Sequence, residues 1–254
     1  MNSESLPVAP SRVSLAEGWT VHRTERVAST NSAVSFFPPW HALQAAEQTA
    51  GRGRTGRTWV SNTGGLWLSA VVPCPGDRSR WAILPLAAGW ALLMALKELN
   101  APALHLRWPN DIMAGHRKLA GLLVERFNDQ TAVIGVGLNV TNSPGSIDPT
   151  LVHTSIRLAD LTAEWPLEHV AKLVLRSLRH AHALICQDQF SVILEDLNRH
   201  WSVPRLVSIT LNGHVQPFTG LFTGVDLQGR LRVTTDYGSY SYDASQVTLL
   251  RELE

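Results

Sequence analysis

Residues 51–59 read GRGRTGRTW, and the fold assignment turns on how these glycines are interpreted. The stretch contains the G-x-G-x-x-G spacing of a dinucleotide-binding loop, which must open a helix facing the pyrophosphate. The residues that follow, TWVSNTGG, are poor helix formers, so they argue against that fold. The arginines Arg52, Arg54 and Arg57 instead predict a loop that binds carboxylate or phosphate. A flexible basic loop without a specific ligand is the alternative.

Around this loop, strand-like and helical segments alternate. Strand composition occurs at residues 65–72, 104–108, 120–125 and 131–140, with a helical stretch at 80–99. From Pro166, apolar side chains recur every three or four residues, which predicts an amphipathic helix followed by a second one at 189–200. Short strands are expected at 206–211, 219–225, 230–235 and 239–243. The order predicts an α+β fold, a mixed sheet with flanking helices, followed by a small β-barrel.

The length of 254 residues allows one large core and a small second unit, and we divide it into three parts. Residues 1–20 are interpreted as a loose leader, 21–203 as the main unit and 204–254 as the barrel. A net charge of +1 provides no sustained field for nucleic acid. The sequence shows no secretory signal, and Cys74 and Cys186 form no disulfide pattern, which favours the cytoplasm. Residues 81–96 are too short for a membrane span and predict a buried helix.

Further motifs occur in a fixed order along the chain. They are Ser29-Thr30-Asn31, Glu47-Gln48, the RWPND of residues 107–111, the KLAGLLVE of 118–125 and the GVGLNV of 135–140. With residues 51–59, they resemble the motifs of biotin protein ligases, from about residue 27 to residue 140. The resemblance implies a catalytic domain like that of class II aminoacyl-tRNA synthetases, followed by an SH3-like barrel. It also implies that biotin is adenylated with ATP to biotinyl-5'-AMP and transferred to a lysine of a biotin carboxyl carrier protein.

The resemblance implies roles for individual residues. The expected biotin contacts are Ser29, Thr30, Asn31, Gln48, Arg52, Gly53, Arg54 and Lys118. The expected nucleotide contacts are Arg54, Arg57, Trp59, Asn110, Asp111 and Asn139. Lys118, Arg52 and Arg54 are expected to be catalytic, because adenylation needs positioning and charge neutralisation rather than a protein nucleophile. Mg²⁺ is implied with ATP, and no dedicated metal-ligand set is proposed. Asp111 and Asn110 are candidates for a place near that ion or near the incoming lysine.

Each motif also has a plainer interpretation. Ser29-Thr30-Asn31 is a good helix N-cap, Trp59 could be a core residue, Asn139 a turn residue and Lys118 a surface lysine. Arg107 stands where the family more often has lysine, which puts any contact of that side chain in doubt. Residues 41–48, HALQAAEQ, favour a helix by propensity, whereas the resemblance implies a strand.

Two rival functions remain open: a lipoate or octanoate ligase of the same fold, and a non-catalytic biotin-binding module. Only about twenty residues precede the motifs, too few for a DNA-binding winged helix, so no DNA partner is expected. No membrane partner is expected either. Family members often pair through sheet edges, which leaves a homodimer open.

Overall fold

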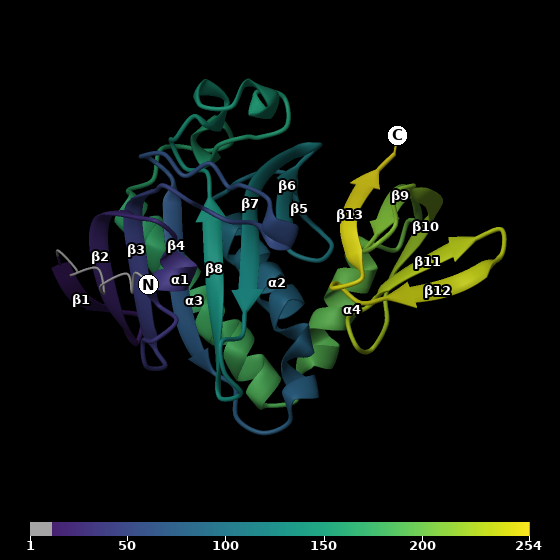
Figure 1. Cartoon of the computed structure of the whole chain (residues 1–254), viewed down its shortest axis with the longest axis horizontal. Coiled ribbons are helices and arrows are strands. Elements are labelled where there is room, and N and C mark those ends of the chain that lie inside the picture. Colours follow the sequence, from purple (N-terminus) through teal and green to yellow (C-terminus); the bar gives the residue numbers. More distant parts are fainter. Residues whose placement is uncertain (1–11, 254) are drawn as a thin grey trace, which may run out of the picture.

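The computed structural model describes residues 12–253, and an eight-stranded mixed sheet lies at its centre (Figure 1). The strand order is β1-β2-β3-β4-β8-β7-β6-β5, with β2 and β3 parallel and the other neighbours antiparallel. The strands are β1 (Arg12–Ala16), β2 (Trp19–Val27), β3 (His41–Gln48), β4 (Leu66–Pro73), β5 (Leu104–Arg107), β6 (Asp111–Ala114), β7 (Arg117–Glu125) and β8 (Thr131–Leu138).

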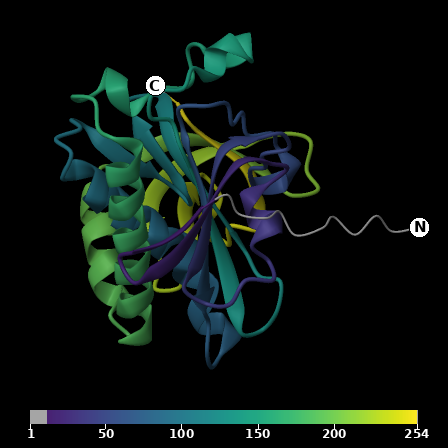
Figure 2. The same cartoon turned by 90° about the vertical axis from the view of Figure 1, so that its left-hand side faces the viewer.

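Two long helices cover one face of this sheet, α2 (Leu84–Lys97) and α3 (Leu167–Cys186), whereas the short α1 (Thr30–Ala33) lies on the other (Figure 2). Side chains alternate between these faces because successive residues of a strand point to opposite sides. On β4, Leu66 and Leu68 enter the core beneath α2 and α3, whereas Ser69 hydrogen-bonds to α1. The face that carries α1 is therefore the one left to form a site.

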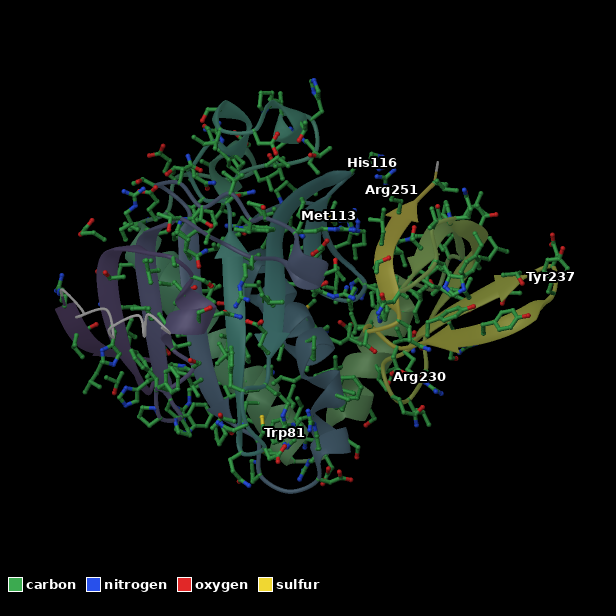
Figure 3. The ribbon with its side chains drawn as sticks, in the orientation of Figure 1. Trp81, Met113, His116, Arg230, Tyr237 and Arg251 are labelled. Carbon is green, nitrogen blue, oxygen red and sulfur yellow. The ribbon has the colours of Figure 1, made fainter. Side chains whose placement is uncertain are left out.

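Helix α2 is buried on nearly every side, as the apolar stretch predicted. A 3-10 turn, η2 (Arg78–Ile83), leads into it. Together, Arg78–Lys97 are long and apolar enough to span a membrane, with mean hydropathy 1.4, but 61% of that window is buried inside the protein. Trp81, near the start of α2 (Figure 3), is 3% exposed and packs in the same core. A core helix accounts for this composition.

The C-terminal part begins with α4 (Phe190–His200) and forms a five-stranded antiparallel sheet, which fits the expected SH3-like unit. Its strands are β9 (Arg205–Leu211), β10 (Phe218–Val225), β11 (Leu231–Thr235), β12 (Gly238–Tyr242) and β13 (Val247–Glu252), in the order β12-β11-β10-β9-β13. Tyr237 marks its outer tip (Figure 3). The indoles of Trp108 and Trp201 tie the two sheets together, donating to Gly229 O at 3.0 Å and to Leu106 O at 3.1 Å.

Two expectations are settled by strand pairing. Residues 41–48 form strand β3, because pairing with β2 and β4 on both sides outweighs helix propensity. The loose leader expected at residues 1–20 is wrong for residues 12–20, which form β1 and the start of β2. Val13 and Leu15 alternate with polar residues along β1 but are 53% and 84% exposed, so pairing with the β2 backbone, and not burial, holds this edge strand. Residues 1–11 lie outside the described part.

Candidate active site

A cavity of about 220 Å³ opens on the face of the sheet that carries α1. Its lining includes every residue expected to contact biotin or nucleotide except Asn139. Those residues come from α1, the end of β3, the 51–59 loop, the β5–β6 turn and β7. The structure thus brings together motifs that are separated by up to 90 positions in the sequence, although their roles as ligand contacts remain predictions.

The inner end of the cavity is a hydrogen-bonded network of neutral polar groups. Gln48 Oε1 accepts from Thr30 N at 2.8 Å and from Thr30 Oγ1 at 2.9 Å, and Gln48 Nε2 donates to Ser61 Oγ at 2.9 Å. Ser69 Oγ lies 2.7 Å from Thr30 Oγ1 and 2.5 Å from Asn31 Oδ1. A hydroxyl carries one hydrogen, so Ser69 can satisfy only one of these acceptors at a time. The network leaves an acceptor for a ligand N–H.

Ser29 begins α1 without capping it. Its backbone is extended, and no side-chain cap hydrogen bond is present, although its carbonyl accepts from Ala33 N at 3.0 Å. The side chain is 6% exposed and lines the cavity. The plain N-cap interpretation therefore leaves the Ser29 hydroxyl unexplained, whereas a ligand contact would use it.

Three glycines form the floor of the cavity, and each leaves room for a different side chain. A Cβ on Gly135 would lie 2.9 Å from Asn31 Cγ and nearer still to its oxygen. A Cβ on Gly137 would lie 2.6 Å from the Trp59 indole, and one on Gly121 would lie 3.0 Å from Lys118 Nζ. The distances at Gly135 and Gly137 are shorter than real Cβ contacts, so a side chain there would force a neighbour to shift, whereas at Gly121 the flexible end of Lys118 would have to move by only a few tenths of an ångström.

The 51–59 loop folds back on itself over the cavity. Trp59 N donates to Gly51 O at 2.9 Å, and Gly53 N donates to Arg57 O at 2.7 Å. Between them, η1 (Arg54–Gly56) is one short turn, and residues 57–65 contain no helix. The dinucleotide-binding interpretation is thereby excluded for this loop.

The loop arginines point in two directions. Arg52 Nη2 lies 3.0 Å from Ser32 Oγ and 3.6 Å from Glu125 Oε2, and the same carboxylate oxygen accepts from Asn31 Nδ2 at 2.7 Å. Arg54 donates to the carbonyls of Ala244 and Val247 ahead of and within β13. Arg57 donates to Thr248 O at 2.9 Å. The loop thus joins the cavity to the C-terminal sheet.

Lys118 reaches the cavity because of a β-bulge. The register between β6 and β7 shifts between Ile112 and Met113, so Lys118 lies on the same face as Gly121. Its Nζ lies 2.6 Å from Asp111 Oδ1 and 4.9 Å from the centre of the Trp59 ring. Arg107 Nη2 lies 2.8 Å from the other oxygen of Asp111.

The protonation of this cluster follows from burial and charge. Burial lowers the pKa of Lys118, and the Asp111 carboxylate opposes that effect. Burial raises the pKa of Asp111, but the charges and hydrogen bonds of Lys118 and Arg107 outweigh it, so the pKa lies below its usual value. In this cluster one carboxylate thus lies between two basic side chains.

A second, smaller cavity of about 70 Å³ adjoins the first along the Trp59 side chain. Its walls are almost entirely apolar, and Leu151 and Pro144 enclose it from the arm at residues 141–160. The buried Trp59 Nε1 has no hydrogen-bond partner within residues 12–253. Asn139 lies in its wall, where its Nδ2 donates to Ile156 O at 3.3 Å and its Oδ1 accepts from Asn142 Nδ2 at 3.1 Å. These bonds match the turn-residue alternative for Asn139.

The described residues do not fit a dedicated magnesium site. Residues 12–253 contain no group of three or more His, Cys, Asp or Glu side chains placed to hold a metal ion. Both oxygens of Asp111 are held by cations, and Asn110 Nδ2 donates to Leu122 O. We derive no step through a protein-bound metal.

Comparison with known proteins agrees with this geometry. Residues 24–139 match the model of the biotin/lipoate A/B protein ligase family. The biotin--[acetyl-CoA-carboxylase] ligase of Mycobacterium tuberculosis is 34% identical to this chain over 219 residues, which cover 82% of this chain and 79% of that protein. The chain belongs to the biotin protein ligase family.

Other members of the biotin protein ligase family are similar to this chain in structure or in sequence. The solved structure of the biotin protein ligase from Aquifex aeolicus, in complex with biotin and ATP, has a TM-score of 0.76 and 25% identity, covering 92% of this chain and 99% of that one. The bifunctional ligase/repressor BirA of Escherichia coli is 31% identical over 204 residues, which cover 77% of this chain and 62% of that protein. The expected fold class is confirmed.

Sequence reasoning assigned no role to several residues of this site, among them Ser69, Gly121 and Glu125. Ser69 is the single polar residue within the buried strand β4, which was a usable signal. Gly121 and Glu125 were quoted within a motif but given no role. Their importance depends on contacts with residues 59 and 31, which no local pattern shows.

Proposed function

We propose that this chain activates biotin with ATP and transfers the biotinyl group to a lysine of a biotin carboxyl carrier protein. The observation that carries the proposal is the cavity itself, which has neutral hydrogen-bonding groups at one end and cations at the other. Biotin has the complementary form, because its ureido head offers N–H donors and a carbonyl, and its valerate chain ends in a carboxylate. The polar end is the place for the ureido group.

The polar end also separates the rival substrates. The acceptor that Ser69 leaves open between Thr30 and Asn31 suits a ureido N–H. Octanoate and lipoate carry no N–H, so either would leave buried polar groups without partners, at a cost of about 1–3 kcal/mol each. A non-catalytic binding module, in turn, would have no use for Lys118 in the cavity wall.

In the first step, the biotin carboxylate attacks the α-phosphorus of ATP, and the bond to pyrophosphate breaks. Lys118 lies at the end beside Asp111, and Arg52 extends from the loop toward α1 and Glu125. Together they would hold the carboxylate and the α-phosphate in place. Arg54 and Arg57, on the side of the loop that meets β13, would lie nearer the remaining phosphates. The apolar cavity beside Trp59 would take the adenine. Mg²⁺ would arrive with ATP and neutralise its phosphate charge.

In the second step, the amine of the carrier lysine attacks the carbonyl carbon of biotinyl-5'-AMP, and AMP leaves. The mixed anhydride must be kept from water until then, and the 51–59 loop covers the cavity that would hold it. We assign catalysis to residues 21–203 and a supporting role to residues 204–254. A cytoplasmic carrier is the expected partner; no DNA or membrane role is proposed, and a homodimer remains compatible with the fold.

The role of Lys118 is tested by measuring each half-reaction separately. Lys118→Ala should lower adenylate formation by about 10²–10³-fold, the usual effect of removing one charge-stabilising donor. Lys172→Ala on the outer face of α3 is the matched control and should change nothing. Near-normal adenylate formation by a folded Lys118→Ala variant would show that the assigned role is wrong.

A further inference from the structure

Lysine is scarce in this chain. It has three lysines, Lys97, Lys118 and Lys172, among 22 basic residues. Lys97 and Lys172 are exposed on α2 and α3, the helices that cover the opposite face of the sheet (Figure 2). Lys118 is therefore the one lysine amine in the wall of the cavity.

If the proposed function is right, this position exposes the Lys118 amine to the reactive adenylate. An acyl adenylate is made to react with a lysine amine, and Lys118 offers one before any carrier arrives. The structure shows what holds this amine. Asp111 Oδ1 lies 2.6 Å from Nζ, the Trp59 ring lies 4.9 Å from it, and Gly121 leaves space for the side chain to lie flat.

We propose that Lys118 is a latent self-acylation site and that Asp111 restrains it by holding its ammonium group in an ion pair. Asp111 is itself fixed, because Arg107 binds its second oxygen at 2.8 Å and β6 pairs it with Gly121 on β7. Arg107 is thus a positioning residue for the carboxylate. This inference rests on the proposed function only in naming the acyl donor.

The reaction that Asp111 prevents is simple. The neutral Lys118 amine would attack the carbonyl carbon of biotinyl-5'-AMP, forming an amide bond as the bond to the phosphate oxygen breaks. AMP would leave with the electron pair, and the nitrogen would release one proton to solvent. The product would be an enzyme that had lost its cavity lysine.

The charged groups around Lys118 indicate how its pKa would change if the Asp111 carboxylate were removed. Burial, Arg107 and Arg57 each lower the pKa of Lys118, and the Asp111 carboxylate is what raises it. Asp111→Asn removes the one opposing charge and keeps the size of the side chain. The neutral amine fraction then rises tenfold for each unit by which the pKa falls, so an increase in acylation of about tenfold or more is expected.

The main experiment supplies purified biotinyl-5'-AMP without carrier, so that it does not depend on adenylate synthesis. Intact-mass and peptide-mass measurements follow the label on the wild type, Asp111→Asn, and Asp111→Asn combined with Lys118→Arg. Asp129→Asn, which changes an exposed ion pair with Arg78, is the matched control. We expect one biotinyl group on Lys118 in Asp111→Asn, about tenfold faster than in the wild type, and none there in the double variant.

A second arm needs no bound adenylate. Trace labelling with the N-hydroxysuccinimide ester of biotin compares Lys118 with Lys97 and Lys172 in the same molecule. Lys118 should be the slowest in the wild type and should gain about tenfold in Asp111→Asn. Equal rates in the wild type, or no gain at Lys118 in a folded variant, would overturn the inference. Failure of the wild type to bind biotinyl-5'-AMP would instead count against the proposed function. The labelling experiment with the N-hydroxysuccinimide ester would then still test whether Asp111 restrains Lys118.

Discussion

Two glycines on one strand allow the two ends of the cavity to be blocked separately. In Gly135→Ala, the new methyl group would displace Asn31, whose Nδ2 donates to Glu125 at 2.7 Å and whose Oδ1 lies 2.5 Å from Ser69 Oγ. The first of these bonds involves a carboxylate and has a net value of about 1.5–3 kcal/mol, and the second about 1 kcal/mol. Losing these two bonds lowers the stability of this end of the cavity. A displaced Asn31 would also leave the ureido group without one of its partners, at a cost of about 1–3 kcal/mol of biotin binding, or roughly 5- to 150-fold in Kd.

Gly137→Ala is the matched control, because the same methyl group two residues along β8 meets the Trp59 indole at 2.6 Å instead of Asn31. Calorimetry with biotin and steady-state kinetics with ATP should therefore separate the variants. Gly135→Ala should weaken biotin binding, and Gly137→Ala should mainly raise KM for ATP. If folded Gly135→Ala bound biotin normally, or if both variants weakened both ligands equally, the assignment of the two ends would be wrong.

Three further predictions concern the loop and the core. Glu125→Gln weakens a partly exposed pair with Arg52 and should speed biotin dissociation about threefold to tenfold in stopped-flow fluorescence, whereas Glu195→Gln on α4 should not. Arg54→Ala removes the hydrogen bonds to the carbonyls of Ala244 and Val247, so Tm should fall. The same variant lacks a cation expected to bind the nucleotide, so KM for ATP should rise about tenfold, and an unchanged KM would rule out a nucleotide role for Arg54. Burial lowers the pKa of His182, so the stability it confers is complete above pH 6.5 and is lost as pH falls through the folded-state pKa. Denaturant titrations at several pH values should show that the free energy of unfolding of His182→Gln depends less on pH than that of the wild type. An equally steep pH dependence in the variant would contradict this assignment.

The sequence could predict the parts of this fold whose signals are local. The periodic apolar side chains that follow Pro166 predicted helix α3, and the poor helix formers at residues 58–65 argued correctly against a dinucleotide-binding loop. Residues 41–48 show where local reasoning fails, because helix propensity there is overridden by strands on both sides. Strand β13, which no pattern indicated, is held by pairing with β9, about forty residues earlier.

The site was predictable as a set of residues but not as a network. Nothing local shows that Glu125 accepts a hydrogen bond from Asn31, 94 positions away, or that Arg54 reaches across to β13. The place of Asp111 illustrates the same limit. From the sequence, Asp111 was a candidate oxygen donor near Mg²⁺ or the incoming lysine. In the structure, its two carboxylate oxygens form ion pairs with Lys118 and Arg107.

The central claim is tested most directly by ATP–pyrophosphate exchange with the purified chain and Mg²⁺, adding biotin, lipoate or octanoate separately. The exchange isolates adenylation and requires no carrier. We expect exchange with biotin and none with the other two acids, and we expect Lys118→Ala to abolish most of it. Exchange with lipoate or octanoate alone would contradict the assigned substrate, and no exchange with any acid would contradict the proposed ligase activity.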